Sequence, residues 1–207
     1  MSEVNRRGFL AGAAAGVATV GSTRLRGESK KAGANERVRV GVIGAGGRAL
    51  SLNRSFAENA NAEIVTIAAL DPRRLPRAVE EVFRRQGPTP KTPEDFRHLI
   101  DDNSLDAIVV GTTDHWHAIP SIMAMLAGKD VYVEKPDSHN IVEGMRMVAA
   151  MKKHKRICQM GSQHRSTTRM QTALAYIKTG ALGRCLVAKA WELSLIHISE
   201  PTRRTPI

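Results

Sequence analysis

Short, nearly continuous apolar runs alternate with amphipathic segments along the middle of the chain. Continuous apolar runs are typical of parallel strands that are covered on both faces, whereas half-exposed strands alternate between apolar and polar residues. The pattern predicts five strands, at residues 37–43, 63–70, 105–110, 130–133 and 156–160.

The segments between these runs have the apolar spacing of α-helices. Thr92 is the expected N-cap of the third helix, because Glu94 and Asp95 would lie in its first turn. Strands that alternate with helices, without hairpin signals between them, predict an α/β fold with a doubly wound parallel sheet, the Rossmann arrangement. The predicted helices cover residues 49–60, 73–86, 93–101, 117–127 and 138–154.

The pattern changes after Met160. A helix is expected over residues 165–179, and Gly180 would end it. Residues 183–192 then alternate between apolar and polar side chains, which predicts a strand. The apolar face of this strand would carry Leu186, Ala188 and Ala190.

The first 34 residues differ from the middle of the chain. Arg6-Arg7 and Phe9-Leu10 precede an uncharged run rich in Ala and Gly, which is too short and too weakly apolar for a stable membrane span. Residues 1–34 resemble a twin-arginine export signal. We therefore expect the twin-arginine export machinery as a partner, and a periplasmic or otherwise exported location.

The last fifteen residues, LSLIHISEPTRRTPI, also differ from the rest. Residues 193–207 resemble the translation of a transposon-based sequencing adapter; the alternative is a genuine tail that contains Ser and Pro. On the adapter interpretation the natural sequence is cut after about Glu192. Residues 35–160 would then form a Rossmann dinucleotide-binding domain, and residues 161–192 would begin a truncated second α/β domain.

The composition is that of a globular protein, with 42% hydrophobic and 25% charged residues. The formal net charge of +11 is compatible with a nucleic-acid partner, but the basic residues are interleaved with acidic ones and only 4% of residues are aromatic. We therefore expect a solvated surface and no nucleic-acid binding. Cys158 and Cys185 adjoin apolar residues and lack metal-ligand spacing, which predicts two small core residues; a disulfide is the alternative.

A glycine-rich turn follows the first predicted strand and opens a helix. Gly44 permits the tight turn, Gly46 lets the backbone approach a pyrophosphate, and Ala49 keeps the helix close to the strand. The alternative is a turn with a structural role only, but the strand–turn–helix context favours a dinucleotide. The predicted cofactor contacts are Gly44, Ala45, Gly46, Gly47, Arg48 and Ala49.

Asp71 ends the second predicted strand. Its carboxylate can accept hydrogen bonds from both hydroxyls of an adenosine ribose. Arg73 and Arg74 would suit a ribose 2′-phosphate, whereas Asp71 would repel one. We therefore expect NAD as the cofactor, with NADP as the alternative. Without a ligand, Asp71 would serve as a cap of the next helix.

The sequence GTTDHWH, residues 111–117, follows the third predicted strand. Ligands of open α/β sheets collect at the carboxyl ends of strands, so we expect Thr112, Thr113 and the imidazole of His117 to face the cofactor. His115 and His117 could instead chelate a metal, but no third ligand is evident. We predict no metal site.

Glu134-Lys135-Pro136 ends the fourth predicted strand, at the same edge of the sheet. An amine there would lie beside a nicotinamide ring, whose positive charge favours the neutral form of the amine. Lys135 could then take the hydroxyl proton of a substrate as hydride leaves the carbon, which is general-base catalysis. Glu134 would hold the lysine and contact the cofactor, and Pro136 would fix the turn through a cis peptide bond. The alternative is a surface ion pair.

Together these motifs resemble those of the Gfo/Idh/MocA oxidoreductase family. VGVIGAGGRA, the turn at Asp71, GTTDHWHA, AGKDVYVEKP and GALGR occur in this order over residues 38–192. The resemblance implies an NAD(P)-binding domain, followed by a domain that supplies the substrate pocket and the contacts of a homo-oligomer. It also implies that Lys135 is catalytic and that further catalytic residues lie beyond Glu192.

The resemblance further implies hydride transfer between the cofactor and a sugar, polyol or related hydroxyl compound. One alternative is a glycosidase of the same family, which oxidises a sugar transiently to permit elimination. A second alternative, of another class, is a non-catalytic nucleotide-binding protein. We expect the truncated chain itself to be inactive.

Overall fold

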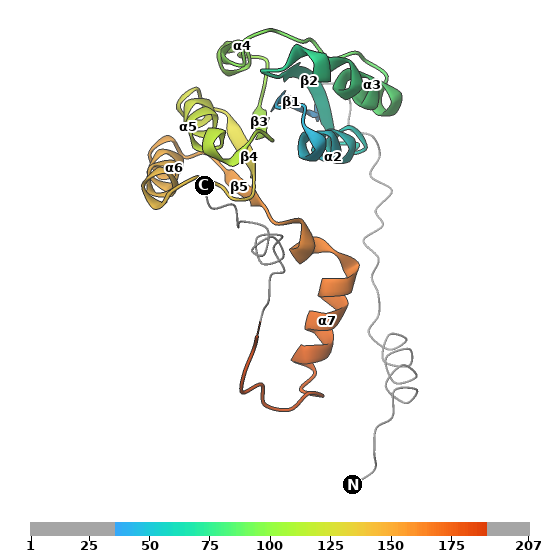
Figure 1. The fold of residues 1–207 in the computed structure, drawn as a ribbon, viewed down its shortest axis with the longest axis vertical. Helices are drawn as coiled ribbons and strands as arrows, with labels where there is room; N and C mark the ends of the chain where they lie inside the picture. The colour runs from blue at the N-terminus through green and yellow to red at the C-terminus, as the bar shows by residue number, and fades with distance from the viewer. Residues whose placement is uncertain (1–35, 190–207) are drawn as a thin grey trace, which may run out of the picture. The chain divides into compact units, whose positions relative to one another are not determined.

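The computed structural model describes residues 36–189, which divide by their contacts into two units after Gly161. The first unit is a five-stranded sheet with helices on both faces (Figure 1). All strand pairs are parallel, in the order β2-β1-β3-β4-β5, so the predicted doubly wound sheet is confirmed. The strands are β1 (Val38–Ile43), β2 (Ala62–Ala68), β3 (Ala107–Val110), β4 (Asp130–Glu134) and β5 (Cys158–Gly161).

Two apolar clusters hold the helices against the sheet. Successive side chains of a strand point to opposite faces, and β3 follows this rule. Val109 belongs to the cluster beneath α2 and α3, while Ile108 and Val110 belong to the cluster beneath α4, α5 and α6. Figure 1 shows the same division of the helices. The helices are α2 (Gly47–Ala57), α3 (Leu75–Gln86), α4 (Arg97–Asp101), α5 (Ala118–Leu126) and α6 (Ile141–His154).

The third predicted helix is shorter than expected. It begins at Arg97 instead of residue 93, and Thr92 is not its cap. Asp95 forms a local turn instead, because its carboxylate accepts hydrogen bonds from the backbone N–H and the Nε of Arg97 (2.9 Å each). Residues 94–96 thereby remain outside the helix, and the side chains of residues 94–97 line the pocket described below.

The second unit contains a short 3₁₀ turn, η4 (Gln163–Ser166), and the helix α7 (Thr168–Lys178). The side chain of Thr167 caps α7 by accepting a hydrogen bond from the Met170 N–H. The strand predicted over residues 183–192 is wrong as far as residue 189, because a strand needs a hydrogen-bonded neighbour and no described residue pairs with this segment. Cys185 is consequently exposed and not a core residue.

Some predictions concern parts of the chain beyond the described residues. The export signal at residues 1–34 and the adapter-like residues 193–207 both lie outside residues 36–189. Within residues 36–189, no helix combines the length and apolar character that a bilayer crossing requires. Cys158, the other predicted core cysteine, is half-buried against the cluster beneath α5 and α6, and both cysteines are free thiols.

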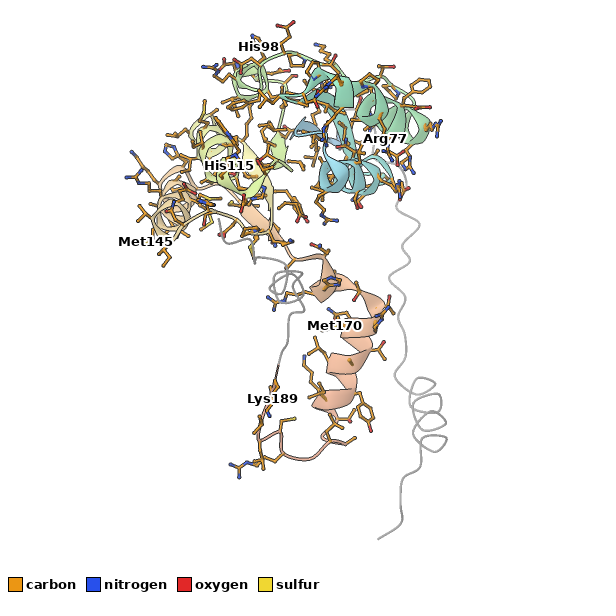
Figure 2. The ribbon with its side chains drawn as sticks, in the orientation of Figure 1. Arg77, His98, His115, Met145, Met170 and Lys189 are labelled. Atoms are coloured by element: carbon orange, nitrogen blue, oxygen red, sulfur yellow. The ribbon has the colours of Figure 1, made fainter. Side chains whose placement is uncertain are left out.

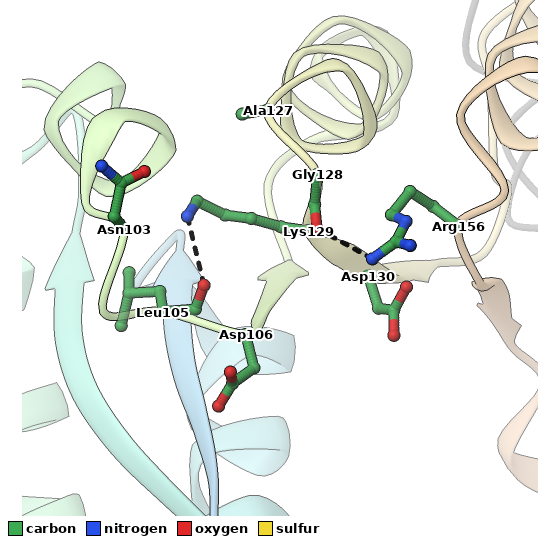
Figure 3. Close-up of a pocket in the computed structure, with 8 residues that line it drawn as sticks. All are labelled: Asn103, Leu105, Asp106, Ala127, Gly128, Lys129, Asp130 and Arg156. Carbon is green, nitrogen blue, oxygen red and sulfur yellow. Dashed lines mark hydrogen bonds between the residues drawn. The ribbon is translucent and has the colours of Figure 1, made fainter.

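A polar cavity of about 350 Å³ lies at the amino ends of β3 and β4, opposite the edge that carries the glycine turn (Figure 3). Lys129 is buried beside it, and its Nζ donates hydrogen bonds to the carbonyl oxygens of Asp102 (2.6 Å) and Leu105 (3.1 Å). Arg156 Nη1 donates to the carbonyl oxygen of Gly128 (3.0 Å). Burial lowers the pKa of Lys129. The ammonium thus joins the end of α4 to the start of β4.

Replacing Lys129 with methionine is expected to lower the free energy of unfolding by about 1–3 kcal/mol, because two carbonyl oxygens lose their donor while the hydrocarbon volume is kept. Denaturant unfolding monitored by circular dichroism measures this change. Lys152→Met on the exposed side of α6 is the control and should change stability by less than about 0.5 kcal/mol. Equal stabilities of the two variants would contradict this role of Lys129.

Candidate cofactor-binding site

The glycine turn joins β1 to α2 and packs against the residue that follows β3. Gly44 has a φ angle of +116°, a conformation that is open mainly to glycine. A Cβ atom there would lie 2.6 Å from the carbonyl oxygen of Gly111. A Cβ atom on Gly111 would in turn lie 3.1 Å from the Cβ of Ala49, which is fully buried. The close helix–strand packing predicted for Ala49 is confirmed.

The N-terminus of α2 borders open space. Gly46 is its N-cap, with extended backbone and no side-chain cap. A Cβ atom on Gly47 would meet nothing within 4 Å, and one on Gly46 would meet only the Arg74 guanidinium, at 3.8 Å. The N–H groups of a first helical turn bind anions. The two glycines therefore leave an open, positively charged cradle, which fits the phosphates of a dinucleotide.

A pocket of about 530 Å³ lies beside this turn. Two aromatic side chains, Phe96 and Trp116, line part of it, and their rings meet edge to face with centroids 6.4 Å apart. Such an apolar, aromatic wall is suited to the flat face of a purine base. The predicted contacts that line the pocket are Gly44, Ala45, Asp71, Thr112 and Thr113.

The two aromatic residues were missed by the sequence analysis for different reasons. Phe96 belongs to the connection between α3 and β3, and only the tertiary fold brings this connection to the pocket. Trp116 lies three residues after the predicted Thr112-Thr113 pair and is one of two tryptophans in the chain. An exposed aromatic residue at a strand tip could have been recognised from this position.

Asp71 lies at the rim of the pocket, after β2. Its carboxylate accepts hydrogen bonds from the Arg73 N–H (3.2 Å), from Arg73 Nε (2.8 Å) and, more weakly, from Arg74 Nε (3.4 Å). These contacts, chiefly the side-chain bond from Arg73, lower the pKa of Asp71 to about 2. The carboxylate is thus ionised at neutral pH and also caps the short turn η2 (Pro72–Arg74). With two guanidinium groups beside one carboxylate, this rim carries a net positive charge.

His117 does not face the cofactor pocket as predicted. The residue is buried, and its Nδ1 lies 2.5 Å from the carbonyl oxygen of Pro136 while its Nε2 lies 3.1 Å from that of Thr112. Each ring nitrogen therefore lies against a backbone carbonyl, to which it can donate when it carries the proton, so the imidazole links two loops. His115 is exposed on the same loop (Figure 2), 3.5 Å from an oxygen of Asp114, so the two histidines do not converge.

Lys135 lies at the end of β4 with an exposed side chain, and the Lys135–Pro136 peptide bond is cis as predicted. Glu134 holds the lysine as predicted, but through the backbone N–H of Lys135 and not through its amine; a contact of Glu134 with the cofactor stays a prediction. One oxygen of Glu134 accepts from Arg48 Nε and Nη2, both at 2.7 Å. The other accepts from the backbone N–H of Lys135 at 3.1 Å. Glu134 thus binds both the Arg48 guanidinium and the backbone of Lys135.

The predicted residues therefore fall into two groups at one edge of the sheet. The first group lines the pocket, and the second group lies around the helix N-terminus and the end of β4. The second group consists of Gly46, Gly47, Arg48, Ala49, His117, Glu134 and Lys135.

Among residues 36–189, no group of three His, Cys, Asp or Glu side chains is arranged to hold a metal ion.

This geometry agrees with a comparison against known protein families. Residues 38–162 match the GFO_IDH_MocA model, described as an oxidoreductase family with an NAD-binding Rossmann fold. The chain belongs to the Gfo/Idh/MocA oxidoreductase family. The family model ends one residue beyond the end of β5, so it covers the whole first unit of the structure from β1 onward.

Individual members of the family are also similar to this chain. Glycosyl hydrolase family 109 protein 2 of Shewanella sp. (strain ANA-3) is 31% identical over 180 residues, which are 77% of this chain and 40% of that protein. The crystal structure of myo-inositol 2-dehydrogenase from Lactobacillus plantarum has a TM-score of 0.64 and 26% identity, covering 72% of this chain and 43% of that one.

A 3-ketoreductase from Actinomadura kijaniata in complex with NADP shares the fold, with a TM-score of 0.63 and 22% identity over 72% of this chain and 46% of that one. This chain therefore spans less than half the length of each of these three relatives. The rest of each relative, beyond the matched part, has no counterpart in the first unit.

Proposed function

We propose that these residues are the cofactor-binding part of an NAD(P)-dependent oxidoreductase that acts on a hydroxyl group of a sugar, a polyol or a related compound. The proposal rests chiefly on the exposed Lys135, which lies at the same sheet edge as the cradle of Gly46 and Gly47. A bound nicotinamide nucleotide would supply the acceptor or donor of hydride.

The residues of the chain would then bind the nucleotide and move a proton. The N-terminus of α2 and Arg74 would hold the phosphates, and Asp71 would accept hydrogen bonds from the adenosine ribose. Lys135 Nζ would take the proton of the substrate hydroxyl as the neighbouring C–H bond breaks, and would return it in the reverse direction. The aromatic wall of Phe96 and Trp116 would contact the adenine.

The positive rim around Asp71 bears on the choice between NAD and NADP. We propose NAD, because an ionised Asp71 repels a 2′-phosphate; Arg73 and Arg74 reduce that repulsion, so NADP is the second choice. Asp71→Ala should weaken NAD⁺ binding about tenfold, the effect of losing a hydrogen bond to a charged group. The same change should weaken NADP⁺ binding less.

Titration calorimetry of the 207-residue chain with both nucleotides tests this prediction and the proposal together. Asp101→Ala is the control, since this carboxylate lies at the end of α4 and outside the pocket. Binding of neither nucleotide by the unmodified chain would sink the proposal. Binding of both, with equal losses in Asp71→Ala, would sink only the assignment of Asp71.

A second candidate function is supported by the similarity to glycosyl hydrolase family 109 proteins. A glycosidase of this kind would oxidise a sugar hydroxyl with NAD⁺, eliminate the aglycone, add water across the resulting double bond and return the hydride to the carbonyl, so NAD⁺ would not be consumed. The test uses the parent protein, that is, the longer protein of which this chain would be the first part. Hydrolysis of aryl glycosides by the parent, with NADH absorbance unchanged at the end, would favour this function over a dehydrogenase.

We further propose that the parent is exported through the twin-arginine pathway and forms a homo-oligomer. The region that its relatives have beyond the matched part would provide the substrate wall, so the 207-residue chain alone should bind nucleotide without turnover. Dehydrogenase activity in the purified chain would contradict this. Retention of export after replacement of Arg6 and Arg7 by lysine would contradict the twin-arginine route.

A further inference from the structure

The turn after β4 combines an exposed residue with two fixed neighbours. Lys135 is exposed, whereas the Glu134 side chain is only 3% exposed and the carbonyl of Pro136 is bonded to a buried histidine. A side chain on such a turn owes its position to the residues that hold its neighbours.

Arg48 holds the residue before the lysine. It is the second residue of α2, so its two bonds to Glu134 connect the glycine turn to the end of β4 across 86 positions of sequence. Because the other Glu134 oxygen accepts from the Lys135 N–H, the guanidinium indirectly orients the lysine backbone. In this ion pair the carboxylate is buried and the guanidinium partly exposed, so desolvation of Glu134 offsets part of the attraction and the pair contributes more to geometry than to stability.

Gly161 makes room for this arrangement. It pairs with Glu134 across β4 and β5, and a Cβ atom on it would lie 2.8 Å from the carboxylate and 2.5 Å from the hydroxyl of Tyr132. Burial, with a smaller effect of the Glu134 charge, raises the pKa of Tyr132, which stays a neutral neighbour of the ion pair. Any larger residue than glycine would displace the carboxylate.

His117 holds the residue after the lysine. Its Nδ1 contacts the Pro136 carbonyl and its Nε2 the Thr112 carbonyl, so the ring couples the pocket loop to the lysine turn. The His117 carbonyl is itself fixed by a 2.6 Å hydrogen bond from the buried Ser121 hydroxyl. The backbone that carries the imidazole is therefore held in place by Ser121.

We propose that Arg48 and His117 are positioning residues for Lys135: one fixes Glu134, the other fixes Pro136, and together they set where the amine stands relative to the glycine turn and the pocket loop. This proposal rests on the proposed function, since the position of the amine affects activity only if Lys135 transfers a proton. Its geometry can be tested without any turnover.

The test compares two substitutions of His117 that each keep one bond. Asparagine places its amide nitrogen where Nδ1 lies and can still donate to Pro136, whereas glutamine mimics Nε2 and can reach only Thr112. Amide hydrogen exchange by NMR on the full 207-residue chain is the readout. His117→Gln releases the Pro136 carbonyl and so loosens the turn that keeps the Lys135 N–H on Glu134. It should accelerate exchange of this N–H about tenfold, whereas His117→Asn should stay within about twofold.

Arg48→Lys gives an independent arm, because an ammonium can replace one of the two bonds to Glu134 but not the fork. It should accelerate the same amide by less than His117→Gln does. The amide of Val40, in the buried centre of β1, is the internal reference. Equal acceleration of Lys135 by both His117 variants, or an equal change at Val40, would overturn the proposal, because either result indicates general loosening of the fold.

A second measurement on the same samples separates this proposal from the proposed function. Lysines are ¹³C-methylated, Lys135 is assigned by loss of its signal in Lys135→Arg, and NAD⁺ is added. If Arg48 and His117 position the amine, saturating NAD⁺ should shift the Lys135 signal in His117→Asn and should shift it less in His117→Gln. Shifts equal in both variants would overturn the proposal. If NAD⁺ does not bind the unmodified chain, the proposed function fails, while the exchange data still decide on the positioning.

Discussion

Replacing Lys135 with methionine in the full-length parent is expected to lower turnover by about 10²- to 10⁴-fold, the range over which a positioned acid or base contributes to catalysis. Methionine keeps most of the hydrocarbon length but cannot accept a proton. The side chain of Lys135 is exposed, so its removal leaves no buried partner unpaired. NAD⁺ affinity should therefore stay close to that of the unmodified protein, and steady-state kinetics combined with calorimetry measures the two effects separately.

The matched control is Lys152→Met, which removes another exposed lysine on α6. Its turnover should be unchanged. A parent protein that keeps its function after Lys135→Met would favour the non-catalytic nucleotide-binding protein, which is the alternative of another class. Loss of NAD⁺ binding together with turnover would instead place Lys135 in cofactor binding alone.

The order of strands and helices can be predicted from this sequence because each element carries its own signal. The strand β3 is a continuous apolar run since this central strand is covered on both faces, and Gly44 and Pro136 mark turns that few other residues can make. The residues that follow strands share one edge because all strands are parallel. The pocket residues Thr112 and Thr113 follow from that rule.

The partners of side chains cannot be predicted in this way. Glu134 adjoins Lys135 in sequence, but a bidentate partner, Arg48, is brought to it by the fold. His117 lies in the predicted loop, yet its ring is buried and each ring nitrogen lies against a backbone carbonyl. The alternating residues 183–189 show the limit for strands, since periodicity describes a face and not the neighbour that must pair with it.

Gly44→Ala is expected to destabilise the fold by about 2–6 kcal/mol, the sum of backbone strain at a positive φ and of a forced clash in a packed site. The added Cβ would lie 2.6 Å from the Gly111 carbonyl oxygen and 2.8 Å from its carbon. Both are backbone atoms at the end of β3, so no side-chain rotation relieves the contact. Since small domains have a total stability of about 5–15 kcal/mol, the variant should unfold at a much lower denaturant concentration.

Gly47→Ala is the matched control, because it makes the same chemical change three residues away without the clash. A Cβ there meets nothing within 4 Å, and Gly47 is the first residue of α2 with no positive φ. Its stability should equal or exceed that of the unmodified chain by up to about 1 kcal/mol, because alanine favours the helix. Denaturant unfolding of both variants gives the comparison. Equal midpoints would show that the glycine turn does not pack against β3 as described, and the cradle for a dinucleotide would lose its support, since that cradle exists only while Gly44 holds the start of α2 against the sheet.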